Sequence, residues 1–143
     1  MYVKQISVFI ENTPGRLAEF TRLLGENHID LISLSIADTA SFGILRGIVA
    51  DWERAMKLIV DAGYTARLND VLTIEVPDQP GSLANVLKML SENDITIEYL
   101  YSFLRDGGKQ AFIILRTEQL DKACETLSNH HVRLLTQEEV SRL

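Results

Sequence analysis

The sequence predicts an α+β fold made of two ferredoxin-like βαββαβ units packed side by side, and three observations lead to this prediction. The 143 residues suit one ordinary domain or two very small ones. One segment recurs, because residues 6–36 align with residues 72–102. Both copies then show strand and helix patterns in the order of a split βαβ unit. We therefore expect two domains, residues 1–69 and residues 70–143.

Identities between the two copies support the repeat. A repeat of this length indicates two structural copies of one unit. The tripeptide Ile44-Leu45-Arg46 also recurs, as Ile114-Leu115-Arg116. The residues of the first copy that meet the same residue 66 positions later are Pro14, Gly15, Leu17, Ala18, Leu24, Glu26, Asn27, Ile29 and Leu34.

The first strand and the first helix of each copy are predicted from side-chain periodicity. Apolar residues alternate along residues 6–10 and 72–76, which is typical of a strand with one buried face. A helix follows in each copy, and Asn27 and Asn93 are expected to close it in the left-handed conformation. The residues expected on the buried faces of these helices are Leu17, Phe20 and Leu24, then Leu83, Val86 or Leu87, and Leu90.

The remaining elements are expected in the same order in both copies. Second strands are predicted at residues 30–37 and 95–104, third strands at 42–50 and 109–117, and last strands at 64–68 and 131–135. A short link then joins the two copies between Leu68 and Val71. The second helix covers residues 51–62, and the second copy has a counterpart of it. The residues expected to face the sheet from these helices are Ala55, Ile59, Ala62, Leu120, Ala123 and Leu127. Thr136 and Glu139 resemble a capping box, so a short helical tail is expected.

Composition and charge exclude several classes of protein. Hydrophobic residues make up 46% of the chain and charged residues 24%, as in globular proteins. No apolar run approaches the roughly 18 residues of a membrane helix, so no membrane partner is expected. The net charge is −6 and neither half is basic, so nucleic-acid binding is not expected. Residues 1–4 do not begin a signal peptide, which predicts a cytoplasmic protein.

Proline is followed directly by glycine at Pro14-Gly15 and at Pro80-Gly81, and the role of these glycines has two interpretations. Proline suits the first position of a helix, but glycine just after it costs about 1 kcal/mol relative to alanine. One interpretation is that the missing Cβ lets a ligand carboxylate reach the N–H groups of the first helical turn. The other is that each glycine only lets the strand turn tightly into the helix.

Both copies share one pattern: a hydrophobic strand, an Asn or Asp, Pro-Gly-x-Leu-Ala, a helix ending in Asn, and then Ile with a second strand. This pattern resembles the ACT domain. The resemblance covers residues 3–68 and 71–135, so the chain is similar to a tandem ACT protein without a catalytic domain. It implies an allosteric regulatory module that binds a small ligand, usually an amino acid, between paired domains. In that family the ligand lies against the loop between the first strand and the first helix, near the second strand of the adjoining domain.

Carried over to this sequence, the resemblance marks a ligand-binding loop in each copy. The loop residues are Asn12, Thr13, Pro14, Gly15, Arg16, Leu17, Asp78, Gln79, Pro80, Gly81, Ser82 and Leu83. Many family members have Asp where the first copy has Asn12, and the second copy keeps Asp78. The two sites are therefore expected to differ in affinity or occupancy. In the second strand of copy two, Glu98 on the helix-covered face is a candidate for binding an ammonium group, although an edge-strand charge without a ligand is the favoured interpretation.

Other conspicuous residues predict no metal site and no cofactor. His130 and His131 are adjacent, so in a strand they point to opposite faces. Cys124 is the only cysteine, which excludes a disulfide or a thiolate cluster within one chain, and we interpret it as a buried apolar residue. Tyr99, Tyr101 and Phe103 alternate opposite Leu100, which predicts an uncovered aromatic stripe and a homodimer joined through it.

Three functions remain open at this stage. The first is amino-acid binding by a non-catalytic regulatory protein. The second is an interaction subunit that regulates a separate biosynthetic enzyme and binds no ligand itself. The third, an acyl-phosphate hydrolase on the same scaffold, needs an arginine-rich phosphate cradle, yet copy one offers only Arg16 and copy two has Ser82. No nucleophile and base recur together either, so no catalytic residue is predicted.

Overall fold

The computed structural model describes residues 2–38 and 41–143, and the chain divides into two compact units. One unit contains Lys4–Asn69, and the other contains Asp70–Ser141 together with Tyr2 and Val3. Each unit has the element order strand, helix, strand, strand, helix, strand. The predicted α+β class and the two βαββαβ units are therefore confirmed. Their packing side by side stays a prediction.

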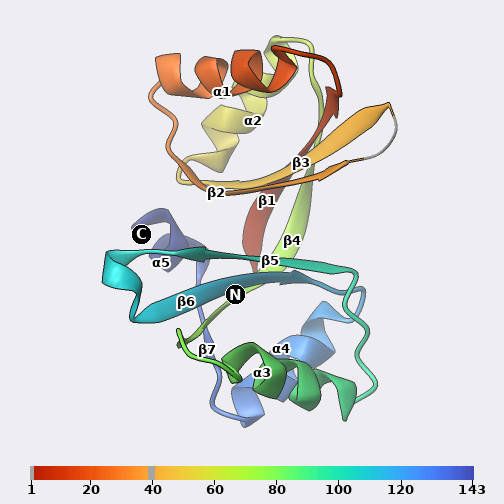
Figure 1. Ribbon diagram of the computed structural model, residues 1–143, viewed down its shortest axis with the longest axis vertical. Coiled ribbons are helices and arrows are strands. Elements are labelled where there is room, and N and C mark those ends of the chain that lie inside the picture. The colour runs from red at the N-terminus through yellow and green to blue at the C-terminus, as the bar shows by residue number, and fades with distance from the viewer. Residues whose placement is uncertain (1, 39–40) are drawn as a thin grey trace. The chain divides into compact units, whose positions relative to one another are not determined.

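The first unit has the strand order of a ferredoxin-like unit. Its elements are β1 (Val3–Glu11), α1 (Arg16–Glu26), β2 (Leu31–Asp38), β3 (Phe42–Val49), α2 (Trp52–Asp61) and the first part of β4 (Thr65–Pro77). The strands lie in the order β2-β3-β1-β4, and β3 is antiparallel to both of its neighbours. Helices α1 and α2 lie on the same face of these strands (Figure 1).

The second unit repeats this arrangement and adds a C-terminal helix. Its elements are the rest of β4, α3 (Ser82–Ser91), β5 (Tyr99–Leu104), a 3₁₀ turn (Asp106–Gly108), β6 (Gln110–Arg116), α4 (Leu120–Asn129), β7 (Arg133–Leu134) and α5 (Gln137–Ser141). The order β5-β6-β4-β7 matches that of the first unit, with helices α3 and α4 on one face (Figure 1). Strands β5 and β7 are shorter than predicted.

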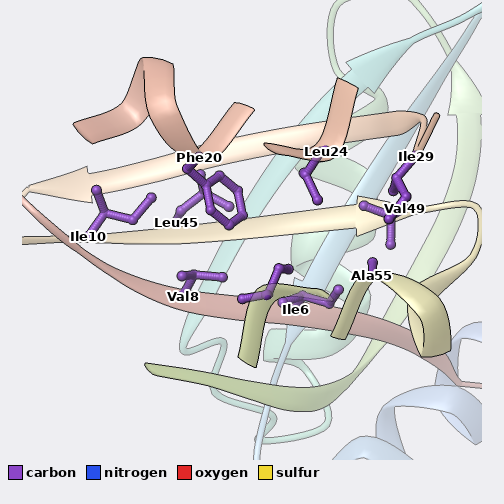
Figure 2. Close-up of a cluster of buried hydrophobic side chains, with 10 residues drawn as sticks. Ile6, Val8, Ile10, Phe20, Leu24, Ile29, Leu45, Val49 and Ala55 are labelled. Atoms are coloured by element: carbon purple, nitrogen blue, oxygen red, sulfur yellow. The ribbon is translucent and has the colours of Figure 1, made fainter. Parts of the chain in front are cut away.

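Each unit encloses its own apolar core, and the strand periodicity that predicted it is confirmed. In the first unit, Phe20 and Leu24 of α1 lie over the apolar side chains of β1 and β3 (Figure 2). Phe20 is 1% exposed and meets the Tyr64 ring edge-on at 5.3 Å. The expectation that Leu17, Leu83 and Ala62 are buried is wrong, because Leu17 and Leu83 are each 38% exposed and Ala62, just past the end of α2, is exposed too.

Strand β4 differs from the prediction in two ways. It runs unbroken for 13 residues, so the expected link between Leu68 and Val71 does not exist. The alternation expected for residues 72–76 is confirmed for the core face, because Leu72, Ile74 and Val76 join one apolar cluster. The expectation of a half-buried strand is wrong, however, because Thr73 on the other face is only 1% exposed.

Helices α1 to α4 share one type of C-terminus. A residue two or three positions past the end of each helix has a positive φ, 55° at His28, 91° at Gly63, 54° at Asp94 and 59° at His131. After α1 the His28 N–H donates to Gly25 O at 3.0 Å and the Ile29 N–H to Leu24 O at 3.0 Å, which is a Schellman motif.

The expectation that Asn27 and Asn93 adopt the left-handed conformation is therefore wrong. Asn27 has φ −98°, and Asn93 is not among the residues with positive φ. Each closes its helix through its side chain instead, because Nδ2 donates at 2.9 Å to the carbonyl oxygen of Leu23 or Met89. The left-handed position falls on the next residue.

The short helix α5 confirms the predicted capping box. The Glu139 N–H donates to Thr136 Oγ1 at 3.2 Å, and the Thr136 N–H donates to Glu139 Oε2 at 2.8 Å. The backbone N–H of Thr136, and after it the Thr136 side chain, holds the pKa of the Glu139 carboxyl below its ordinary value by hydrogen bonding to the carboxylate. Glu139 also binds Arg133, which is paired with Glu75 across β4 and β7.

Because Glu75 and Thr73 share a face of β4, α5 lies on the face opposite α3 and α4 (Figure 1). The expectation that this face has no helix is wrong. Tyr99, Tyr101 and Phe103 do share it, but they are half-buried, and Phe103 stacks on Phe112 at 5.1 Å. The homodimer predicted for this face stays a prediction.

Candidate functional site

The two Pro-Gly pairs form the same turn in both units. Residues 13–16 make a β-turn in which the Arg16 N–H donates to Thr13 O at 3.4 Å, and residues 79–82 repeat it with the Ser82 N–H and Gln79 O at 3.3 Å. Gly15 has φ 85° and ψ −13°, which are the angles of the third residue of a type II turn. Proline at the second position and glycine at the third are the residues that this turn type favours. We call these two turns the Pro-Gly corners.

Each corner glycine is also the N-cap of the helix that follows it. The Gly15 carbonyl accepts from the Glu19 N–H at 2.9 Å, and the Gly81 carbonyl accepts from the Asn85 N–H at 3.0 Å. The expectation that Pro14 occupies the first helical position is therefore wrong, since α1 begins at Arg16. The left-handed φ alone requires glycine here, which favours the turn interpretation over close approach by a ligand.

Replacing Gly15 or Gly81 by alanine is expected to lower the free energy of unfolding by roughly 1–2 kcal/mol. A Cβ at either position meets no atom within 4 Å, so the cost comes only from the positive φ. Gly25→Ala is the matched control, because it also meets nothing within 4 Å but lies inside α1. That variant should gain about 0.5–1 kcal/mol. Urea titration measures both, and equal stability of Gly15→Ala and the parent chain contradicts the assignment.

The N-termini of α1 and α3 carry no side-chain cap within the described residues. By contrast, Asp51 caps α2 by accepting from the Arg54 N–H at 3.1 Å. The N–H groups in the first turn of α1 and α3 thus have no side-chain acceptor, and the positive end of the helix dipole favours an anion beside them.

An apolar hollow lies beside the first Pro-Gly corner, and we call it the corner hollow. Residues 10–13 form one wall, and Leu17 of α1, Ile36 of β2 and Gly43 and Leu45 of β3 complete it. Leu17 and Ile36 are 38% and 45% exposed, so they present apolar surface to solvent. This hollow brings together three predicted residues, Asn12, Thr13 and Leu17, with side chains from β2 and β3.

The second corner offers different side chains at the matching positions. Strand register places Ala111 where the first unit has Gly43, because Val76 pairs with Ala111 as Ile10 pairs with Gly43. Ser102 stands where the first unit has Ile36, while Leu83 is 38% exposed like Leu17. The first corner is therefore the more apolar of the two, and the expected difference in affinity or occupancy stays a prediction.

A second cavity of the first unit lies where β4 begins and shares Ile10 and Glu11 of β1 with the corner hollow, and we call it the Arg16 groove. It is formed by residues 9–11, Arg16, Glu19, Phe42 and residues 62–65. Arg16 Nη2 lies 3.4 Å from Glu11 Oε2, and Nη1 lies 3.3 Å from Glu19 Oε2. These carboxylates, Glu11 first, raise the pKa of the Arg16 guanidinium, and burial raises the pKa of Tyr64.

The second unit has a cavity at the equivalent place, which we call the Arg133 groove. Residues 75–77, Ser82, Asn85, Gln110 and residues 131–133 line it. The two grooves correspond because Glu11 pairs with Phe42 in one unit as Pro77 pairs with Gln110 in the other. Arg133 Nε lies 2.6 Å from Glu75 Oε2, so the cation of this groove comes from β7 and not from the first helix.

The predicted residues are thus divided among several places. Arg16 lines the Arg16 groove, and Gln79 and Ser82 line the Arg133 groove. Gly15 and Arg22 line a further hollow. Glu98 precedes β5, and its carboxylate lies 3.1 Å from Arg116 Nε, so strand alternation does not assign it to the helix-covered face. Residues that the sequence interpretation missed are Glu11, Glu19, Ile36, Gly43 and Tyr64.

Two further observations concern metals and membranes. Within residues 2–38 and 41–143, no group of three or more His, Cys, Asp or Glu side chains is placed to hold a metal ion. Cys124 is half-buried and packs against the core of the second unit. No helix in the described part of the chain is both long and apolar enough to span a bilayer.

Comparison with known proteins places these features in a family context. A family model described as an ACT domain pair matches residues 1–143. The crystal structure of protein BT0572 from Bacteroides thetaiotaomicron is 41% identical with a TM-score of 0.94, over 100% of this chain and 98% of that one. None of the curated proteins matches this chain.

More distant structures share the fold. The regulatory subunit of aspartate kinase from Thermus thermophilus has a TM-score of 0.62 at 16% identity, over 88% of this chain and 91% of that one. The regulatory subunit of aspartate kinase from Thermus flavus has a TM-score of 0.61 at 16% identity, over 90% and 92% of the two chains.

Proposed function

Because this chain belongs to the family of ACT domain pairs, we propose that it is a non-catalytic regulatory protein that binds a free amino acid at its Pro-Gly corners. The observation that carries the proposal is the corner hollow, whose apolar lining includes Leu17 in the first turn of α1, a helix without a side-chain N-cap. The walls suit an amino-acid side chain, and the first turn of α1 suits a carboxylate. The regulatory subunits of aspartate kinase from two Thermus species share this fold.

The test is a thermal-shift screen of the full chain against the twenty amino acids. A ligand that binds only the folded state stabilises it by about 2.7 kcal/mol at a hundred-fold excess over Kd. We therefore expect at least one amino acid to raise the Tm by several degrees. If none of the twenty raises the Tm, the proposal is wrong.

Two substitutions then assign the site. Leu17→Glu introduces a charge into the corner hollow and should abolish the Tm shift that binding there causes. Leu83→Glu introduces a charge at the second corner and should abolish the Tm shift that binding at that corner causes. Val60→Glu is the control, because Val60 is an exposed apolar residue of α2 outside both the corner hollow and the Arg16 groove. Loss of the shift in Val60→Glu as well contradicts binding at the corners.

A second candidate function is an interaction subunit of a separate biosynthetic enzyme that binds no amino acid itself. Leu34 and Ile36 favour it, because they are 39% and 45% exposed on β2, at the edge of the first unit. Apolar side chains exposed together on an edge strand mark a contact surface. This function predicts no Tm shift with any amino acid, so the same screen separates the two candidates.

A further inference from the structure

The charges of the Arg16 groove are not balanced among themselves. One guanidinium, that of Arg16, lies between two carboxylates, Glu11 at 3.4 Å and Glu19 at 3.3 Å. All three side chains are about half exposed, so these ion pairs contribute little to stability. A ligand carboxylate can therefore replace them at small cost.

We propose that the Arg16 groove binds an α-amino acid whose side chain carries a positive charge. The proposal deepens the proposed amino-acid-binding function and rests on it. The planar guanidinium of Arg16 matches a carboxylate in a bidentate arrangement. Once it holds the ligand carboxylate, Glu11 and Glu19 are two carboxylates that favour positive charge on the ligand. The α-ammonium group of the ligand supplies one positive charge, and the side-chain cation supplies the other.

The walls of the groove favour the same class of ligand. Phe9 and Phe42 are 41% and 50% exposed, although aromatic side chains usually bury most of their surface. An aromatic ring beside a carboxylate binds an organic cation through both the ring face and the charge. The cavity volume is ≈ 250 Å³, below the roughly 300–1,000 Å³ typical of pockets for drug-sized molecules. The groove thus suits a ligand of amino-acid size.

The Arg133 groove provides an internal comparison. Ser82 and Asn85 stand where the first unit has Arg16 and Glu19, so the helix contributes no charge there. The two opposite charges among its lining residues, Glu75 and Arg133, pair with each other at 2.6 Å, so the lining has no excess carboxylate for a cationic ligand. The proposed ligand class therefore applies to the first unit alone.

The experiment is isothermal titration of the full chain with L-lysine and with L-norleucine, which has no side-chain ammonium group. We expect L-lysine to bind at least about ten-fold more tightly than L-norleucine, since a hydrogen bond to a charged group is lost in the latter. Arg16→Gln should weaken L-lysine binding by at least about ten-fold. Arg22→Gln should leave it unchanged, because Arg22 is an exposed cation of the same helix outside the groove.

A spectroscopic measurement on the unsubstituted chain covers the case in which a variant does not fold. On addition of L-lysine, the ring resonances of Phe9 and Phe42 should shift. Those of the stacked pair Phe103 and Phe112, in the other unit, should not. Equal binding of the two ligands, equal effects of Arg16→Gln and Arg22→Gln, or unmoved Phe9 and Phe42 resonances each overturn the proposal.

Failure here is distinguishable from failure of the proposed function. If some other amino acid raises the Tm and depends on Leu17 but not on Arg16, the regulatory function stands and the groove assignment is wrong. If no amino acid raises the Tm at all, both are wrong.

Discussion

Phe20→Ala is expected to lower the free energy of unfolding by about 3–5 kcal/mol. Phe20 is 1% exposed, lies over β1 and β3, and meets Tyr64 edge-on. The substitution therefore removes a buried ring and leaves a cavity that the neighbouring strands fill only in part. Small proteins are stable by only about 5–15 kcal/mol, so the loss is a large share of the total.

Trp52 offers the measurement, because it is the only tryptophan and packs against the same core. Its fluorescence during denaturant titration reports on the first unit. Phe42→Ala is the control, since that ring is 50% exposed and its loss should cost less than about 1 kcal/mol. If both variants unfold at the same denaturant concentration, Phe20 does not occupy the core position described.

Thr73→Val is expected to raise the free energy of unfolding by about 1–2 kcal/mol. Thr73 is 1% exposed, and its Oγ1 has no hydrogen-bond partner in the described part of the chain. Valine has nearly the same shape, so the substitution removes the cost of a buried, unpaired hydroxyl without creating a cavity. Measuring the denaturation midpoint of the variant tests this.

Thr117→Val is the matched substitution with the opposite expected sign. Thr117 is 0% exposed, but its Oγ1 donates to Thr96 O at 2.7 Å and accepts from the Gln119 N–H at 3.2 Å. Valine leaves the Thr96 carbonyl oxygen and the Gln119 N–H without this hydrogen-bond partner, which should lower the free energy of unfolding by about 1–3 kcal/mol. A loss of stability in both variants contradicts the environment described for Thr73.

Local patterns predicted the order of elements because each βαββαβ unit repeats one sequence. The alternation of Ile6, Val8 and Ile10 and the capping box at Thr136 depend only on neighbouring residues, and both are confirmed. The burial of Val71 and Thr73 was missed, since burial of both faces of β4 depends on residues distant in sequence.

The candidate site was predicted less completely than the fold. The corner residues were found because they recur at Pro14-Gly15 and Pro80-Gly81. The function assigned to the glycines was less secure, since sequence does not reveal the sign of φ, which is 85° at Gly15. The Arg16 groove was missed because Glu11, Glu19 and Tyr64 come from three elements that only the fold brings together. One feature of the sequence could have revealed the groove. Equivalent positions of the two copies differ in charge, with Arg16 opposite Ser82 and Glu19 opposite Asn85.

The N-terminus has a consequence for the order of events during synthesis. Tyr2 packs against the core of the second unit, and its hydroxyl donates to Asp121, 119 residues later in the chain. Ribosomes add about 5–20 residues per second, so this hydrogen bond forms at least several seconds after Tyr2 is made. Residues 4–69 can be complete long before then. The second unit, by contrast, includes Tyr2 and the buried Val140, so it cannot finish folding until both of these residues have been made.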